Sequence, residues 1–254
     1  MMDGILLINK PVGITSRDVV NMVSKKFNTK KIGHTGTLDP FADGLLVLTI
    51  GKGTKCSQFL EEKVKTYVAT LSLGKSTDTL DKDGVAVEEK EVKQYSIEDI
   101  TNVLESFKGE ITQTVPLYSA IRVNGKKLYE YARNGIQVEL PSRQINIFDI
   151  KLLHYEGNII RFEVTCSKGT YIRVLGNDIA HKLGTLGHLI SLTRKKVGSF
   201  LLENSKKVED IKNGKHLPFE TKIDRLFVCS EKNEPIAIIE RDHGKIFKVV
   251  RGLF

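Results

Sequence analysis

Tryptophan is absent from this 254-residue chain, cysteine occurs only three times, and long apolar runs are missing. The cysteines, Cys56, Cys166 and Cys229, are odd in number and far apart, which excludes a disulfide framework and a CxxC metal site. No apolar run approaches the roughly 20 residues that a membrane-spanning helix needs. The N-terminal stretch MMDGILLINKPVG carries an acidic residue and indicates a strand and a turn rather than a signal peptide. We therefore expect a protein of the reducing cytoplasm that has no membrane contact.

Patterns that hold a metal ion or a nucleotide phosphate are also lacking. The six histidines form neither an HxH nor an HExxH pattern, and no GxxxxGK[ST], GxGxxG or GxSxG motif occurs. The segment TDTLDKDG imitates a calcium loop, with Thr79, Asp81, Asp83 and Gly84 at positions 1, 3, 5 and 6. Position 12 is Lys90, where such a loop requires a glutamate. The sequence therefore predicts neither a metal site nor a nucleotide-phosphate loop, and carboxylate chemistry remains the main option.

Positive charge is in excess, with a formal net charge of +8 and a pI of about 9.2. Lysine and arginine gather in the segments KKFNTKK, NGKKL, TRKKVG and NSKKVED. Such clusters fit a polyanionic partner, although many basic proteins bind no nucleic acid, so the charge alone leaves both interpretations open.

Hydrophobic patterning indicates an α+β protein with a mixed or largely antiparallel sheet. Branched apolar runs and period-two alternation predict strands over residues 4–10, 44–51, 65–74 and 146–167, the last a hairpin turning near Gly157. A terminal hairpin is predicted to turn at residues 242–244, after a domain boundary near residues 210–220. Strands outnumber helices but alternate with them, which favours α+β over a parallel α/β fold.

Helices are predicted by apolar spacing and by capping residues. Ser16 is expected to cap the first helix. The second is expected to start at Ser96 with a capping box, to bury Ile97 within its apolar stripe and to end at Gly109. A third is expected over residues 171–184, where Gly184 ends it.

The stretch GHTGTLDPFADGLL, residues 33–46, is rich in turn formers and leads into a buried strand. Asp39 therefore lies in a loop at the edge of a predicted sheet, a frequent position for catalytic groups. Its spacing equally suits an aspartate that merely starts a turn before Pro40. The loop by itself leaves both roles open.

Five blocks, in order over residues 4–198, resemble the signature of the bacterial tRNA pseudouridine-55 synthases, the TruB family. They are LLINKPVGITS, GHTGTLDPFADGLLVLTIGKGTK, KTYVATLSLGKSTDTLDKDG, QTVPLYSAIRVNGKKLYEYARNG, and CSKGTYIRVLGNDIAHKLG with HLISLTRKKVG. The chain departs from the family pattern at Asp43, where threonine is usual, at Val115, where proline is frequent, and at Arg122, where lysine is usual.

The resemblance implies the pseudouridine synthase fold, α+β with a mixed, largely antiparallel central sheet and flanking helices. It implies a catalytic domain over residues 1–212 that contains an RNA-clamping insertion near residues 110–140. Residues 213–254 would form a short, reduced PUA-like β segment. The short tail favours a stand-alone enzyme over the related synthases that depend on a guide RNA and partner proteins.

The implied reaction breaks the N1–C1′ bond of a uridine, rotates the base and rejoins it through C5, without oxidation and without a cofactor. The resemblance makes Asp39 the catalytic carboxylate, Arg173 the cation that holds it, and Tyr67 the ring that stacks on the base and helps to remove the C5 proton. Attack on C1′, attack on the ring and proton abstraction all remain open as the role of Asp39.

The resemblance also assigns residues to binding of the T stem-loop of tRNA. His34 would fill the place that the flipped uridine leaves in the stack. Lys65 would reach the site or contact a phosphate, Tyr171 and Leu192 would wall the base pocket, and Lys126 with Lys127 would clamp the loop. We expect a cytoplasmic monomer that needs no protein partner.

Three other functions remain open from the residues. One is guide-dependent or ribosomal RNA pseudouridylation on the same fold. Another is a non-catalytic RNA-binding protein or RNA chaperone. A glycosidase with paired carboxylates would share the chemistry at C1′ but would want an aromatic-rich sugar cleft, and this chain has no tryptophan.

Overall fold

The computed structural model describes residues 4–61, 64–209, 225–229, 235–242 and 246–252. The chain divides into two compact units, and each is described by itself. The first unit contains residues 1–65 and 193–254, and the second contains residues 66–192. The chain passes between them inside two strands, β4 (Lys65–Leu73) and β12 (Gly187–Val197).

The first unit is built on β3 (Asp43–Ile50), which pairs with three strands. β1 (Gly4–Lys10) runs antiparallel to it, as does β2 (Ile32–His34), while β12 pairs parallel with its start at Thr193 and Arg194. Shorter or later strands extend this sheet: β13 (Phe200–Leu201), β14 (Lys206–Lys207), β15 (Arg225–Cys229), β16 (Pro235–Asp242) and β17 (Ile246–Gly252). The predicted strands at residues 4–10 and 44–51 and the strand pairing of the terminal hairpin are confirmed, while the predicted turn at residues 242–244 falls largely outside the described residues.

Helix α1 (Ser16–Phe27) packs its apolar side on the first-unit sheet. The core there consists of Leu6, Ile8, Val19, Val20, Val23, Leu46, Leu48, Ile50 and Val208. The expectation that Ser16 caps the helix is wrong, because Thr15 is the N-cap and forms a capping box with Asp18. Ser16 is instead buried and bonds to Leu38. Its hydroxyl therefore holds the Asp39 segment and does not cap the helix.

The unit also contains two 3₁₀ turns, η1 (Gly51–Cys56) and η2 (Leu202–Asn204), and the short helix α2 (Ser57–Glu61).

The second unit holds a sheet in the order β12-β4-β11-β10-β7. β11 (Ile159–Cys166), β10 (Ser142–Glu156) and β7 (Gly109–Thr114) pair antiparallel in succession. In β4 every second residue is buried from Lys65 to Leu73, as the alternation in the sequence predicts. The mixed, largely antiparallel sheet and the α+β class are thus confirmed.

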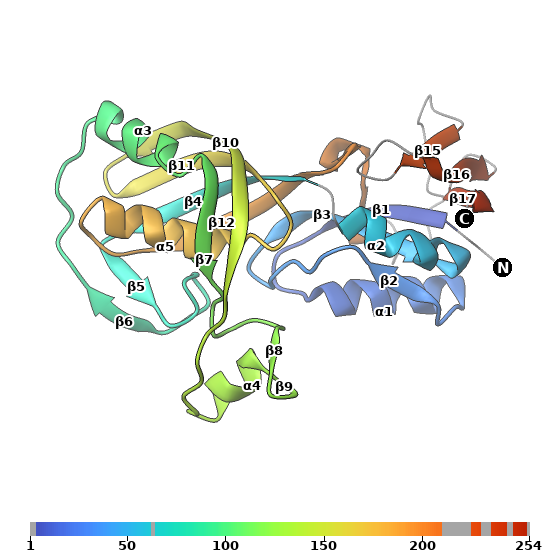
Figure 1. The fold of residues 1–254 in the computed structure, drawn as a ribbon, viewed down its shortest axis with the longest axis horizontal. Helices are drawn as coiled ribbons and strands as arrows, with labels where there is room; N and C mark the ends of the chain where they lie inside the picture. Colours follow the sequence, from blue (N-terminus) through green and yellow to red (C-terminus); the bar gives the residue numbers. More distant parts are fainter. Residues whose placement is uncertain (1–3, 62–63, 210–224, 230–234, 243–245, 253–254) are drawn as a thin grey trace. The chain divides into compact units, whose positions relative to one another are not determined.

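Two helices pack on this sheet, α3 (Ile97–Glu105) and α5 (Ile172–Lys182) (Figure 1). The capping box of Ser96 and Asp99 is confirmed. Ile97, expected to be buried, is 67% exposed because it stands in the first turn outside the packed face. Gly109 does not end the helix, which stops at Glu105; it opens β7 with a φ of 100°.

Between β7 and β10 the chain makes the insertion, residues 115–141. It contains the hairpin of β8 (Arg122–Val123) and β9 (Lys126–Lys127) and the helix α4 (Leu128–Arg133). Figure 1 shows these elements as a small lobe that two irregular segments of the chain join to the second-unit sheet. A second hairpin, β5 (Lys75–Thr77) with β6 (Ala86–Glu89), lies in the same unit.

The proposed domain boundary near residues 210–220 lies outside the described residues, and the division at residue 212 stays a prediction. No helix in the described part of the chain combines the length and the hydropathy that crossing a membrane requires.

Candidate functional site

The Asp39 loop, residues 35–42, is held at both ends by main-chain hydrogen bonds. The amide of Thr35 donates to Val47 at 3.1 Å, and the amide of Ala42 donates to the carbonyl of Asp39 at 3.1 Å. The carbonyl of Pro40 accepts from Gly13 at 2.8 Å. Asp39 therefore does start a turn, as one interpretation of the sequence expected. That role does not compete with chemistry, because the side chain takes no part in these bonds.

Ser16 fastens the loop from the side of α1. Its hydroxyl accepts from the amide of Leu38 at 2.9 Å and donates to the carbonyl of Leu38 at 3.1 Å. Ser16 is 2% exposed, so both bonds lie away from solvent. The residue directly before Asp39 is thus fixed to a helix whose own position is set by the core.

Arg194 holds the same loop from β12. Its side chain is 1% exposed, and it donates to the carbonyls of Leu45 at 2.7 Å, Gly36 at 3.0 Å and Thr37 at 3.4 Å. β12 reaches this position because it pairs with β3 at Gly44. A Cβ at Gly44, whose φ is 104°, would stand 2.5 Å from the carbonyl oxygen of Arg194. The close strand pairing that delivers the guanidinium therefore requires glycine.

Lys10 is the second buried cation beside this loop. Its ammonium donates to the carbonyls of Ile14 at 2.8 Å and Pro11 at 2.9 Å. Burial lowers the pKa of Lys10 to about 8, against the opposing effect of the Asp43 and Asp39 carboxylates. The two carboxylates are therefore close enough to Lys10 to act on its charge.

His34 and Lys65 are the other predicted site residues of the first unit. Burial, with smaller effects from Arg17 and Arg194, lowers the pKa of His34 below its ordinary value. The Nδ1 atom of His34 accepts from the amide of Gly36 at 3.4 Å, so the neutral imidazole carries its proton on Nε2. Lys65 is 7% exposed and donates to the carbonyl of Glu61 at 2.9 Å. A neutral, flat ring and a buried ammonium thus accompany Asp39 in this unit.

Arg173 is the central cation of the second unit. It is 4% exposed and lies in the first turn of α5. Its guanidinium donates to the carbonyls of Thr79 at 2.5 Å and Tyr118 at 3.0 Å, and its Nε lies 3.6 Å from the carboxylate of Asp81. Backbone from two separate segments therefore fixes its orientation.

The segment that imitates a calcium loop has a different role in the structure. The carboxylate of Asp81 accepts from the hydroxyl of Thr79 at 2.7 Å and from the amide of Asp83 at 3.1 Å, besides facing Arg173. The carboxylate of Asp78 accepts from the amide of Val85 at 2.8 Å and the hydroxyl of Tyr118 at 3.0 Å. Across the described residues no group of three or more His, Cys, Asp or Glu side chains is arranged to hold a metal ion. These aspartates order the loop that supports Arg173.

Tyr171, directly before α5, is held by Gln113 of β7. The Gln113 side chain, 1% exposed, accepts from the amide of Tyr171 at 2.7 Å and donates to its carbonyl at 3.1 Å. The guanidinium of Arg143 lies 5.4 Å from the centre of the Tyr171 ring. Tyr67 on β4 and Leu192 on β12, also of this unit, are 7% and 6% exposed. These three residues supply aromatic and apolar surface within one unit.

Lys126 and Lys127 lie on the hairpin of the insertion. Lys127 is half-buried, with its ammonium 5.3 Å from the centre of the Tyr129 ring, and Arg133 lies 5.4 Å from the same ring. Lys126 is exposed. Arg122, one of the departures from the family pattern, donates to the carbonyl of Gly125 at 2.7 Å and so closes the hairpin turn. The insertion thus presents two lysines beside a tyrosine and an arginine.

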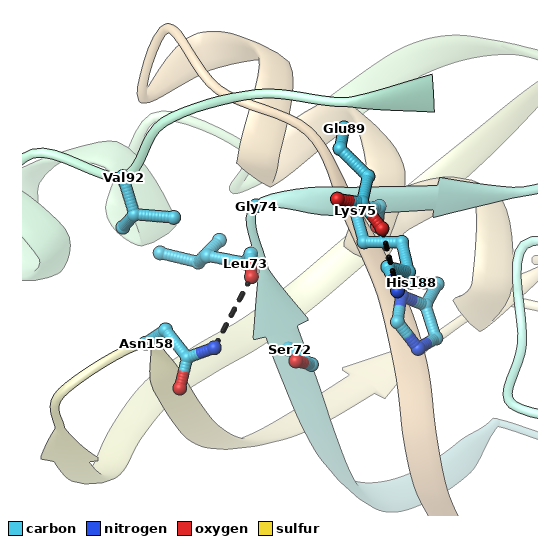
Figure 2. A pocket seen from close by; sticks show the side chains of 8 residues that line it. All are labelled: Ser72, Leu73, Gly74, Lys75, Glu89, Val92, Asn158 and His188. Carbon is cyan, nitrogen blue, oxygen red and sulfur yellow. Dashed lines mark hydrogen bonds and ion pairs between the residues drawn. The ribbon is translucent and has the colours of Figure 1, made fainter. Parts of the chain in front are cut away.

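A pocket of about 480 Å³ in the second unit is lined by other residues (Figure 2). Its polar groups are engaged with their neighbours: Lys75 pairs with Glu89 at 2.7 Å, and His188 Nδ1 lies 2.9 Å from the carbonyl of Lys75. Asn158 donates to the carbonyl of Leu73 at 3.3 Å. None of the predicted site residues lines this pocket, so it is not the candidate site.

Comparison with known families assigns the chain. Residues 24–172, more than half of it, match the model of the TruB family pseudouridylate synthase, N-terminal domain. The chain belongs to the TruB family.

TruB relatives cover most of the chain. The tRNA pseudouridine synthase B of Hydrogenovibrio crunogenus is 46% identical over 213 residues, which is 84% of this chain and 70% of the relative. The Bacillus subtilis protein of the same name is 50% identical over 80% of this chain and 68% of its own length. That of Mesoplasma florum is 37% identical over 98% of this chain and 97% of its own.

The fold of this TruB chain also occurs in solved structures. The crystal structure of a Cbf5-Nop10-Gar1 complex matches with a TM-score of 0.67 and 23% identity, over 99% of this chain and 85% of that one. At this level of identity the likeness shows the pseudouridine synthase fold alone.

The structure sorts the predicted site residues of the TruB chain into two sets. His34, Asp39 and Lys65 belong to the first unit, and Tyr67, Lys126, Lys127, Tyr171, Arg173 and Leu192 to the second. Sequence reasoning missed the residues that hold them: Ser16, Gln113 and Arg194. Gln113 lies between Thr112 and Thr114 in the QTVP block, and nothing in that stretch marks it as buried. Arg194 was counted with the lysines of TRKKVG, and no local signal separates a buried arginine from exposed neighbours.

Proposed function

We propose that this chain converts a uridine in the T stem-loop of tRNA, position 55, to pseudouridine, with Asp39 as the catalytic carboxylate. The observation that supports this most strongly is the rigid presentation of Asp39 in the family motif. Ser16, Arg194 and three main-chain bonds hold the loop that carries the Asp39 side chain. Preorganised geometry of this kind lowers the cost of reaching a transition state.

The reaction is an isomerisation, so every atom of the uridine is kept. The N1–C1′ bond breaks, the uracil rotates, a C5–C1′ bond forms, the proton on C5 leaves and N1 gains a proton. Asp39 acts on the sugar or the base during the exchange of bonds, and Arg173 is the cation that the proposal assigns to the reaction. Tyr67 stacks on the uracil and assists loss of the C5 proton.

The remaining residues bind the RNA and hold the flipped nucleotide. His34, whose lowered pKa keeps it neutral near pH 7, fills the place that the uridine leaves in the stack, because an uncharged ring stacks on bases without desolvating a charge. Tyr171 and Leu192 wall the base pocket, and Lys65 contacts the RNA. Lys126 and Lys127, on the exposed insertion hairpin, clamp the loop through phosphates.

We further propose that the chain acts as a cytoplasmic monomer, without a protein partner, on a single arm of tRNA. RNA-binding proteins commonly recognise loop shape and unstacked bases rather than duplex sequence. The insertion supports this mode because its cations and aromatic ring lie within one small hairpin and helix.

The test is release of tritium from [5-³H]uridine by the purified chain, with whole tRNA and with an isolated T-arm hairpin. We expect both substrates to react at comparable rates without added protein or metal. Asp39→Asn should lower the rate by at least about 1,000-fold while tRNA binding persists, as expected for a group that acts on the breaking bond.

Asp43→Asn is the matched control, since it removes a second carboxylate only four residues away. It should keep most of the activity. Turnover by Asp39→Asn close to that of the unmodified chain would refute the assignment of the carboxylate. An inert hairpin beside a reactive tRNA would refute the single-arm model, and activity only with added proteins would favour the guide-dependent alternative.

A further inference from the structure

Ser119 lies at the base of the insertion and is 7% exposed. Its amide donates to the carbonyl of Leu117 at 3.0 Å, and its carbonyl accepts from the amide of Tyr129 at 3.1 Å. The main chain of Ser119 therefore fastens α4 to the start of the insertion. Its side chain has no share in this, because the Oγ atom is buried and has no hydrogen-bond partner within the described residues.

A buried hydroxyl without a partner is uncommon and unfavourable. Most buried side-chain polar atoms in proteins have at least one partner, and an unpaired one has lost its bonds to water without replacement. An alanine at the same position would have the same shape without that loss. A partner outside the described residues, such as a bound ligand, would account for the serine at this position.

The surroundings of Ser119 indicate the chemistry of that group. The preceding carbonyl, that of Tyr118, accepts from the guanidinium of Arg173 at 3.0 Å. The Tyr118 hydroxyl donates to Asp78 at 3.0 Å, so it too is engaged. Ser119 is thus one peptide away from a buried cation. The Arg173 charge is shared with the Asp81 carboxylate, so the serine hydroxyl itself indicates the ligand chemistry: it can donate to an electronegative oxygen.

We propose that the Ser119 hydroxyl donates a hydrogen bond to a backbone oxygen of the RNA substrate, of a phosphate or of a ribose, where the insertion meets Arg173. The proposal rests on the proposed function, since it takes the substrate to be RNA. It makes Ser119 a substrate-binding residue that joins the clamping insertion to the cation of the reaction. No motif pattern assigns it this role; only the unpaired buried oxygen does.

The test compares stability and RNA affinity in Ser119→Ala. The free protein should be as stable as the unmodified chain or more stable, because the substitution removes an unpaired polar atom. Its Kd for the T-arm hairpin should rise roughly two- to tenfold, the value of one hydrogen bond. Urea unfolding and a fluorescence binding titration give the two quantities.

Ser16→Ala is the matched control for the sign of the stability change. Ser16 is equally buried, but its hydroxyl has two partners, so its removal should destabilise the protein. A hairpin with 2′-deoxyuridine at the target position separates the two oxygens. The penalty of Ser119→Ala disappears on that hairpin if the 2′-hydroxyl of the target nucleotide is the partner, and it persists if the partner is another backbone oxygen.

The possible failures are distinct. If Ser119→Ala lowers stability and binds the hairpin as tightly as the unmodified chain, the hydroxyl is structural and the inference is wrong. If the unmodified chain makes no pseudouridine while Ser119→Ala still weakens RNA binding, the proposed function fails and the RNA contact stands. An active chain whose hairpin affinity is unaffected by Ser119→Ala overturns the Ser119 proposal alone.

Discussion

The two units each bury one arginine next to a predicted catalytic segment, and the two arginines are held differently. Arg194, 1% exposed, donates to three carbonyls, of Gly36, Thr37 and Leu45. Arg173, 4% exposed, donates to two carbonyls and also faces the carboxylate of Asp81. The same side chain thus meets backbone dipoles in one unit and dipoles with a carboxylate in the other.

This difference suggests a structural role for Arg194 and a role in the reaction for Arg173. Every bond of Arg194 goes to the strand or loop around Asp39, so its donors shape the backbone that presents the acid. Arg173 donates instead to two segments in different parts of the second unit, the loop of Thr79 and the base of the insertion. A buried cation needs such compensation, since an unpaired one is strongly unfavourable. We therefore expect Arg194 to matter first for stability and Arg173 first for rate.

Of the two arginines, Arg173 should have the larger effect on the reaction when lysine replaces it. A single ammonium cannot reproduce the planar fork that reaches both carbonyls and Asp81. We expect tritium release to fall at least about 100-fold, as displacement of a reacting group does. Arg194→Lys, the same substitution in the first unit, should slow the reaction by no more than about tenfold. Equal losses in the two variants would remove the distinction between the two arginines.

Stability tests the supporting role of Arg194 separately. Arg194→Lys leaves at least one of three carbonyls without its buried donor, and we expect the free energy of unfolding to fall by about 2–4 kcal/mol. Urea unfolding followed by circular dichroism measures this. Lys195→Met, the next residue along β12 and an exposed one, should change stability little. If the two variants unfold at the same urea concentration, Arg194 does not support the loop.

A smaller effect concerns the charge on Lys10. Its pKa is about 8 in the folded protein and 10.5 when unperturbed, so above pH 8 the unfolded chain holds this proton more firmly. Below pH 8 both states are protonated and the full penalty of the buried charge applies. The contribution of Lys10 to the free energy of unfolding therefore rises between pH 8 and 10.5, by about 2 kcal/mol from pH 7.5 to 9.5.

Lys10→Met should lack that rise, which urea midpoints at the two pH values would show. Asp43→Asn sharpens the test, because loss of a carboxylate that raises the pKa of Lys10 should move the rise to lower pH. An identical pH dependence in the Lys10→Met variant would mean that other groups produce the change.

Long, strongly patterned elements were predictable from the sequence. β1, β3, β4 and the hairpin of β10 and β11 were all expected, because branched runs and alternation reflect burial on one or both faces of a strand. The residue that caps a helix was harder to predict. Thr15 and Ser16 are chemically equivalent as caps, and only the contact of Ser16 with Leu38 decides between them. The short strands β2, β8 and β9 carry too few residues for a pattern, so their partners alone define them.

The sequence by itself determined the order of motifs, and with it the TruB family and the candidate residues His34, Asp39 and Arg173. Motifs are local, and their residue types and spacing can be compared without any structure. The tertiary structure alone decided that Arg194 is buried while Lys195 is exposed, that Gln113 holds Tyr171, and that the Ser119 hydroxyl has no partner in the part of the chain that the structure describes. These properties depend on chain segments far apart in sequence, because burial and hydrogen bonding are set by what packs against a side chain and not by its neighbours along the chain.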